Sequence, residues 1–227
     1  MHRFYIAPEN WDSRGLTLRD AEAHHARDVL RMTCGERAVV FNGQGREITA
    51  EIVDIAKGDV RLRKLHESET LPLRCRITLG QAIPKGKNMD LIVQKAVEIG
   101  AAEIAPLISE RTIVDLDKKE AEQKQAKWQQ IAIEAAKQCG QNWLPHIQIP
   151  QKPKDFFAVA TGLRPVPTSH IDVATTFDLR LIGSLQPDAI HLKTILTNYV
   201  AQHRDRPWSV LMMVGPEGDF TPAELAL

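Results

Sequence analysis

The stretch Val210–Phe220, VLMMVGPEGDF, is the sharpest feature of the sequence. It joins a run of five apolar residues directly to a Gly-Pro-Glu-Gly turn. A short apolar run of this kind predicts a buried strand of a parallel sheet. Gly215 and Gly218 allow positive φ and a close backbone approach, and Pro216 stiffens the turn between them. Ligands of open parallel sheets bind beyond the carboxyl ends of strands, so the turn is either a ligand loop or a plain tight turn.

The turn does not match the common phosphate-binding loops. The chain has neither a Gly-x-Gly-x-x-Gly fingerprint nor a Gly-x-x-x-x-Gly-Lys-Ser/Thr motif. Those patterns mark dinucleotide and nucleoside triphosphate sites. A ligand at this turn would therefore belong to another class.

Strand-like and helix-like segments alternate from about residue 73 onward, which is typical of a parallel sheet with crossover helices. The predicted strands are 76–83, 103–108, 178–185 and 208–214, and the predicted helices are 88–100, 118–139 and 190–202. Asn88 is the predicted cap of the first helix, and 152–176 is predicted to be surface loop. The predicted inner faces are Leu91, Ile92, Lys95, Ala96 and Ile99 on the first helix, and Trp128, Ile131, Ala135 and Cys139 on the second.

The first part of the chain has a different pattern. One helix is predicted over 20–32, and extended runs broken by glycine turns follow at 36–43, 46–55 and 59–65. Such runs predict a small β-barrel. The polar segment 67–72 ends in a proline and is typical of a linker, so the sequence predicts domains at 1–72 and 73–227.

The composition is that of an ordinary globular protein, with 29 basic and 29 acidic residues among 227. A net charge of zero argues against a protein that coats nucleic acid indiscriminately. Two basic clusters still offer contacts for phosphates, or are simply solvated surface charge. They are Arg61, Arg63 and Lys64, and Arg74, Arg76, Lys85 and Lys87.

Other functional classes find little support in the sequence. No apolar run is long enough for a membrane helix and the first residues do not form an export signal, so a cytoplasmic protein is expected. Cys34, Cys75 and Cys139 are too far apart for a metal site and are expected to be small structural hydrophobes. His24 and His25 point about 100° apart on a helix and cannot bind one metal ion together. No metal is expected.

Five separated blocks resemble, in the same order, the RsmE family of ribosomal RNA small-subunit methyltransferases. The blocks are HHARDVLRM (24–32), FNGQGREITAEI (41–52), QKAVEIGAAEIAPLISERT (94–112), KWQQIAIEAAKQCGQNWLPHI (127–147) and MMVGPEGDFTPAE (212–224). The resemblance covers most of the chain outside about 151–177. No block decides the matter alone, but five in register are hard to obtain by chance.

The resemblance implies an N-terminal PUA-like barrel that contacts RNA and a C-terminal SPOUT domain, an α/β fold with a trefoil knot. It implies a homodimer that uses S-adenosyl-L-methionine to methylate the ring imino nitrogen of a specific uridine in the 16S ribosomal RNA. The implied cofactor-binding residues are Leu185, Val214, Gly215, Pro216, Glu217 and Gly218. The alternative is a non-catalytic RNA-binding relative of the same fold.

Methyl transfer from a sulfonium depends mostly on positioning, but the uracil nitrogen must also lose its proton. Arg111 is the candidate that stabilises the developing uracil anion, although an ion pair with Glu110 or Asp115 would explain it equally well. Glu217 is the candidate proton acceptor, or a residue that orders the turn. Substrate contacts are expected from the cations Arg61, Arg63, Lys64, Lys85 and Lys87. Gln138, four residues after Glu134 on one helix face, would reach the pocket across the dimer, or the two belong to a solvent-facing stripe.

The chain departs from the family pattern in three places. Asp219 follows Gly218 where the family has a second glycine, and Gln141 stands where the family often has arginine. The family also continues through a further segment that threads the knot, whereas this sequence ends at Leu227. The expectation is therefore a C-terminally incomplete knot and a natural protein that is longer.

Overall fold

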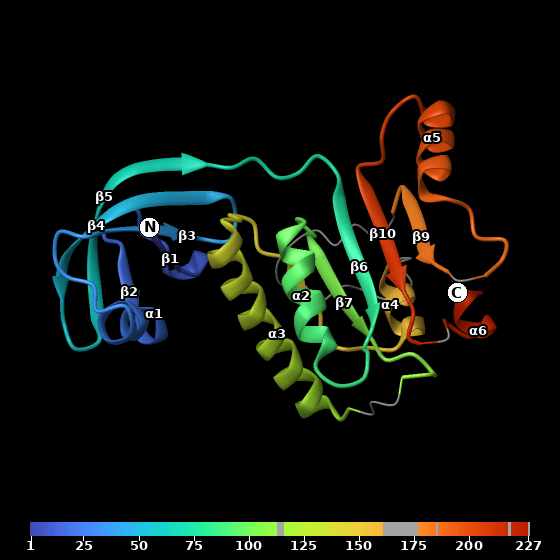
Figure 1. Ribbon diagram of the computed structural model, residues 1–227, viewed down its shortest axis with the longest axis horizontal. Coiled ribbons are helices and arrows are strands. Elements are labelled where there is room, and N and C mark those ends of the chain that lie inside the picture. The colour runs from blue at the N-terminus through green and yellow to red at the C-terminus, as the bar shows by residue number, and fades with distance from the viewer. Residues whose placement is uncertain (113–115, 161–176, 185, 218, 227) are drawn as a thin grey trace. The chain divides into compact units, whose positions relative to one another are not determined.

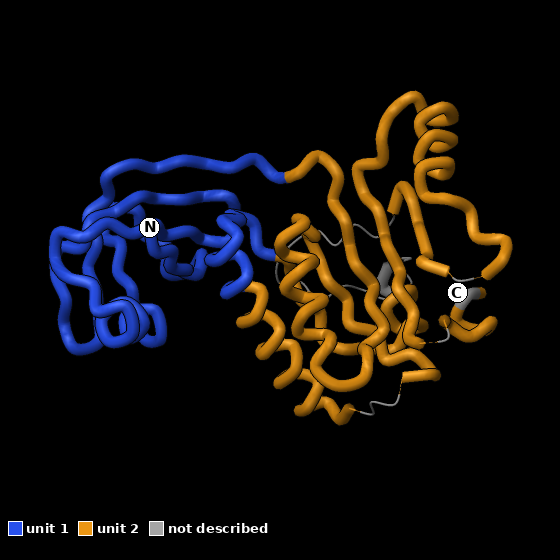
Figure 2. The backbone as a smooth tube through the Cα atoms, viewed as in Figure 1, with its two compact units in different colours: residues 1–72, 133–144 blue, residues 73–132, 145–227 orange. Residues whose placement is uncertain are grey.

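The computed structural model describes residues 1–112, 116–160, 177–184, 186–217 and 219–226 (Figure 1). Two compact units share these residues (Figure 2). Unit 1 comprises Met1–Pro72 with Ile133–Leu144, and unit 2 comprises Leu73–Ala132 with Pro145–Leu227. Unit 1 thus contains a segment that the sequence-based division at residue 72 places in the second domain. The domain bounds 1–72 and 73–227 stay a prediction.

Unit 1 is built on a curled five-stranded sheet with the order β1-β3-β4-β5-β2. Its strands are β1 (His2–Tyr5), β2 (Thr17–Arg19), β3 (Arg37–Phe41), β4 (Arg46–Ile55) and β5 (Asp59–Glu69). Only the β1–β3 pair is parallel, and two register shifts interrupt β4 and β5, as expected where a sheet bends strongly. Because the described order ends at β1 and β2, the sheet forms an open half-barrel where the sequence predicted a small barrel.

The predicted helix over 20–32 forms in unit 1 but is shorter and irregular. After the short 3-10 turn η1 (Pro8–Asn10), α1 (Asp20–His24) continues directly as the π-helical turn η2 (His25–Val29). Arg31 then takes a positive φ of 54°, which ends the helical path. Ala23 and Ala26 pack against the inner face of the sheet, where Phe4, Leu18, Ile48 and Ile52 form the core, and all six side chains are buried.

Unit 2 is built on a parallel sheet with the order β8-β7-β6-β10-β9. The strands are β6 (Arg76–Ala82), β7 (Glu103–Leu107), β8 (His146–Ile147), β9 (Leu179–Gly183) and β10 (Ser209–Val214). The four strands predicted from the sequence all form, and β8 is an additional short edge strand. Strands β7 and β8 lie on one side of β6, and the later strands β9 and β10 lie on the other side. The strand order therefore reverses between β6 and β10.

The helices of this part of the chain are α2 (Asn88–Glu98), α3 (Lys118–Cys139), α4 (Pro153–Ala160), α5 (Leu192–His203) and α6 (Pro222–Leu225). The predicted face of α2 was wrong at most positions: Ala96 is buried as predicted, but Leu91 and Ile99 are exposed, whereas Val93 and Val97 are buried. The cap was wrong too, because Lys87 precedes the helix and its side chain makes no capping hydrogen bond.

Two further expectations fail for reasons of packing. Residues 153–160 form α4 instead of loop, because the helix buries Phe156 against Leu107 and Leu211 of the sheet. Cys34 and Cys139 are exposed instead of buried. Cys139 is the last residue of α3. The buried side chains Trp128 and Ala132 lie earlier in the helix.

Candidate functional site

The carboxyl edge of the parallel sheet in unit 2 gathers the loops that follow β6, β7, β9 and β10. Val214 is the last residue of β10, and the Gly-Pro-Glu-Gly turn begins directly after it. Since β10 lies next to β6, this turn stands at the reversal in strand order, where open parallel sheets bind ligands.

Asp219 closes the turn after β10. Its backbone has a φ of 71°, and its N–H donates to the carbonyl oxygen of Pro216 at 3.0 Å. The side chain is 8% exposed. Its Oδ1 accepts from the N–H of Phe220 at 2.9 Å, and its Oδ2 accepts from the hydroxyl of Ser184 at 3.1 Å. Ser184 directly follows β9, so this carboxylate joins the loops after β9 and β10.

The loop after β7 is joined to the same turn. Arg111 donates from a guanidinium nitrogen to the carbonyl oxygen of Asp219 at 3.3 Å. The N–H of Glu110 donates to Oε1 of Glu224 at 2.9 Å, and Glu224 forms a reciprocal capping box with Thr221 at the start of α6. Arg111 is exposed and thus keeps a face toward solvent. Asp115, one of its predicted alternative partners, lies outside the described residues.

The described residues among those predicted to line the cofactor site are accessible at this edge. Val214, Gly215 and Pro216 are half-buried and Glu217 is exposed. A Cβ atom added at Gly215 would lie 3.2 Å from Oδ1 and from the Cα atom of Asp219. A side chain would therefore disturb the turn at this position. Leu185 and Gly218 lie outside the described residues.

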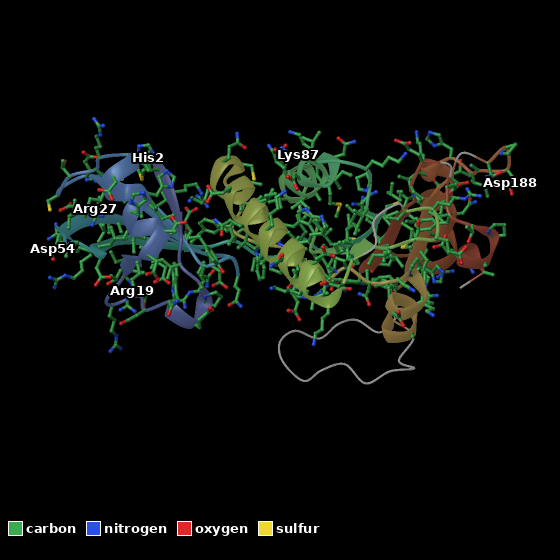
Figure 3. All side chains as sticks on the ribbon, turned by 90° about the horizontal axis from the view of Figure 1, so that it is seen from below. His2, Arg19, Arg27, Asp54, Lys87 and Asp188 are labelled. Carbon is green, nitrogen blue, oxygen red and sulfur yellow. The ribbon has the colours of Figure 1, made fainter. Side chains whose placement is uncertain are left out.

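The predicted RNA contacts fall into two groups. Lys85 and Lys87 are exposed in the loop between β6 and α2, at the same edge as the turn, and neither has an ion-pair partner among the described residues (Figure 3 labels Lys87). In unit 1 the exposed cations of β5 are paired with carboxylates. The pairs are Arg61 with Asp54 at 2.5 Å, Arg63 with Glu51 at 2.8 Å and Lys64 with Glu67 at 3.1 Å.

Gln138 lies near the end of α3, is exposed, and belongs to unit 1. The same segment is fixed to the half-barrel by the main chain and side chain of Asn142, whose Oδ1 accepts from Arg3 at 2.6 Å. Trp143 adds a hydrogen bond from Nε1 to the carbonyl oxygen of Thr70 at 2.8 Å. The 133–144 segment is therefore part of the folded half-barrel.

Three further observations limit the site. Within the described ranges, no three His, Cys, Asp or Glu side chains are grouped as a metal site would need. The helices described are too short or too polar to cross a membrane. A groove of about 570 Å³ runs along α5, but none of the predicted cofactor residues is among its lining residues, so we place the candidate site at the strand ends.

Comparisons with known proteins agree with the two-part organisation. The sequence model of a family described as "RNA methyltransferase domain" matches residues 71–227, and one described as "RNA methyltransferase PUA domain" matches residues 18–65. A protein of Synechocystis named "Ribosomal RNA small subunit methyltransferase E" is 30% identical over 227 residues, which cover 100% of this chain and 67% of the relative. A protein of the same name from Bacillus subtilis is 32% identical, with 92% of this chain and 76% of the relative covered. The chain belongs to this RsmE family of RNA methyltransferases.

A solved structure from the RsmE family supports the fold. The crystal structure of ribosomal RNA small subunit methyltransferase E from Neisseria gonorrhoeae bound to S-adenosyl methionine has a TM-score of 0.77 and 32% identity. The match covers 100% of this chain and 84% of that chain. The expectation of an RsmE-type protein with a PUA domain and an α/β methyltransferase domain is therefore confirmed.

The sequence patterns did not reveal three residues of the site, Thr221, Glu224 and Ser184. The capping box of Thr221 and Glu224 had a detectable signal, since a threonine followed three residues later by a glutamate is typical of a helix start. Ser184 had none, because a lone serine after a strand is ordinary. Its role depends on which strands become neighbours.

Proposed function

We propose that this chain uses S-adenosyl-L-methionine to methylate the ring imino nitrogen of a specific uridine in small-subunit (16S) ribosomal RNA. The observation that carries the proposal is the assembly of Val214–Glu217, Asp219 and Arg111 at the strand-order reversal in unit 2. Membership of an RNA methyltransferase family supports the reaction class. The bound S-adenosyl methionine of the Neisseria relative supports the cofactor.

The residues at this edge suit S-adenosylmethionine, which combines an adenine with a positively charged sulfonium. Val214, Gly215 and Pro216 are half-buried at a strand end and offer main-chain groups and apolar surface to an adenine. Asp219 places a carboxylate directly beside Gly215, which suits a cationic ligand. The cofactor, when bound, supplies an activated methyl group on sulfur.

The remaining steps belong to residues of this chain. Arg111 lies at the turn and keeps a solvent-facing side, so its guanidinium can stabilise the negative charge that develops on a uracil carbonyl oxygen. Glu217 is exposed on the same turn and is proposed to accept the imino proton. Lys85 and Lys87 would hold phosphates beside the target nucleotide.

The wider assembly is proposed from family membership. The C-terminal unit would adopt the SPOUT knot, and two copies would form a homodimer in the cytoplasm. Gln138 would then contact the substrate from the partner copy, while Arg61, Arg63 and Lys64 of the half-barrel would contact RNA at a distance from the reacting base.

The decisive experiment combines binding and product analysis. Calorimetry would measure S-adenosylmethionine binding, and small subunits incubated with the protein and cofactor would be digested and analysed by mass spectrometry for methylated uridine. We expect saturable binding and one modified uridine, methylated on the ring nitrogen. RNA binding without methyl transfer would instead support the non-catalytic relative, and methylation of another atom or base would contradict the proposed chemistry.

A further inference from the structure

Asp219 is the residue of the turn for which the sequence comparison offered no role. It adopts a φ of 71°, a conformation that glycine reaches without strain and that most other residues avoid. Its side chain is nevertheless buried in the turn, with 8% of the residue exposed. A glycine would satisfy the backbone alone, so the carboxylate itself needs an explanation.

The carboxylate accepts hydrogen bonds from two neutral donors. These are the hydroxyl of Ser184 at 3.1 Å and the N–H of Phe220 at 2.9 Å. Among the described residues no lysine, arginine or histidine forms an ion pair with it. Arg111 donates to the main-chain oxygen of Asp219 and not to its carboxylate. The turn therefore holds a positioned carboxylate whose own hydrogen-bond donors are neutral.

This charge lies against the main chain that is proposed to hold the cofactor. A Cβ atom at Gly215 would be 3.2 Å from Oδ1 of Asp219. Charges in such a partly buried turn are screened less by water and salt than charges on the open surface. The carboxylate can thus act on a ligand bound across Gly215 and Pro216.

We propose that Asp219 makes the site prefer the charged cofactor S-adenosylmethionine to the neutral product S-adenosylhomocysteine. The inference rests on the proposed function and adds to it a reason why the product S-adenosylhomocysteine is released. The two ligands differ by one methyl group and one positive charge on sulfur. During transfer the sulfur keeps the bonding electron pair and loses its charge as the methyl joins the deprotonated uracil nitrogen. The attraction of Asp219 for the ligand weakens at that moment, which favours release of the product.

The test is the ratio of the dissociation constants of the two ligands. Asp219→Asn removes the charge but keeps an oxygen that accepts from Phe220 and an amide that hydrogen-bonds Ser184. By calorimetry we expect this variant to bind S-adenosylmethionine at least fivefold more weakly, which corresponds to about 1 kcal/mol, and S-adenosylhomocysteine within twofold of the unchanged protein. Asp219→Gly suits the positive φ of the backbone. Like Asp219→Asn, it should lower the dissociation constant of S-adenosylhomocysteine relative to that of S-adenosylmethionine.

Two controls separate charge from structure. Ser184→Ala removes a hydrogen bond but keeps the charge, so the ratio should stay close to that of the unchanged protein. Asp205→Asn removes an exposed carboxylate paired with Arg74 and should also leave the ratio unchanged. Equal weakening of both ligands in Asp219→Asn and Asp219→Gly would overturn the inference, because Asp219 would then only tie the loops. Failure of the unchanged protein to bind either ligand would overturn the proposed function itself.

Discussion

Asp219 and Arg111 at the carboxyl edge each combine a structural contact with a proposed functional role. Asp219 ties the turn to Ser184 with its side chain and to Arg111 with its main chain. Arg111 makes this contact with one nitrogen while its residue remains exposed. Because five N–H donors share one rigid guanidinium, a contact on one side orients the other side for a substrate. The turn and the proposed catalytic cation therefore hold each other in place.

The role of Arg111 can be separated from cofactor binding. Arg111→Ala should slow methyl transfer by about 100-fold or more, since a donor that stabilises a developing oxyanion typically contributes that much. Affinity for S-adenosylmethionine should change less than threefold, because the guanidinium is assigned to the uracil. Calorimetry and single-turnover methylation of small subunits would measure the two effects, with Arg180→Ala on the exposed side of β9 as the control. Loss of cofactor binding with unchanged RNA binding would reverse the assignment.

Elements follow the sequence wherever the local pattern and the tertiary structure agree. The long helix was predicted at 118–139 and forms at Lys118–Cys139, and the strand before the Gly-Pro-Glu-Gly turn forms at Ser209–Val214. The inner face of α2 was predicted wrongly because Leu91 and Ile99 are as apolar as the residues that are buried. Only the neighbours that Val93 and Val97 meet decide which side faces inward. Ser184 could not be predicted for the same reason, because its partner Asp219 lies 35 residues away in the sequence.

Helix α1 and the end of α3 are held together in unit 1 by a buried ion pair. Nζ of Lys137 lies 3.0 Å from Oε1 of Glu22, and these side chains are 8% and 17% exposed. Burial raises the pKa of the Glu22 carboxyl, and the charge of Lys137 opposes that rise. Since the folded state raises this pKa, folding favours the protonated carboxyl, and stability falls as pH rises above the ordinary glutamate range.

Removing the cation should therefore destabilise unit 1 in a pH-dependent manner. Lys137→Met should lower the free energy of unfolding by about 3 kcal/mol at pH 8, because it leaves a buried carboxylate without its partner. The loss should be smaller at pH 5, where the carboxyl of Glu22 can take up a proton. Glu22→Leu combined with Lys137→Met should recover much of the stability at pH 8. Urea denaturation at both pH values would measure this, and a loss of equal size at pH 5 and pH 8 would show that the charge of Glu22 is not the cause.

The loop between β6 and α2 carries two exposed lysines, Lys85 and Lys87, that form no ion pair with the described residues. Replacing Lys85 and Lys87 together with alanine should weaken small-subunit RNA binding and reduce the slope of log affinity against log salt by up to about 2, since each phosphate contact contributes somewhat less than 1. S-adenosylmethionine affinity should not change. The control is the Arg180→Ala and Arg206→Ala double variant, which removes the same charge from exposed positions away from this edge. An equal effect of the two double variants would mean that only net charge matters.

The molecule as a whole combines two units with separate sheets, and both match RNA methyltransferase families. The presence of two different folds could be predicted from the sequence, because a β-rich pattern in the first part of the chain gives way to alternating strands and helices. The assignment of 133–144 to the half-barrel could not, since it depends on contacts such as Asn142 with Arg3, 139 residues apart. If the proposed function is correct, a protein with this organisation contacts RNA through both units, with the chemistry in unit 2.

The size of the RNA should therefore decide how well it is methylated. A short uridine oligonucleotide can reach only the edge that carries Arg111, whereas a small subunit or a large fragment of its RNA can also meet the cations of β5. We expect kcat/KM for the oligonucleotide to be at least about 100-fold lower, which corresponds to about 2.8 kcal/mol of lost transition-state stabilisation. Replacing Arg61, Arg63 and Lys64 with glutamine should slow methylation of the small subunit but not of the oligonucleotide. The fold should tolerate these changes, because exposed ion pairs contribute little to stability. Equal efficiency on the two substrates, with no effect of the triple variant on either, would show that the half-barrel takes no part in choosing the RNA.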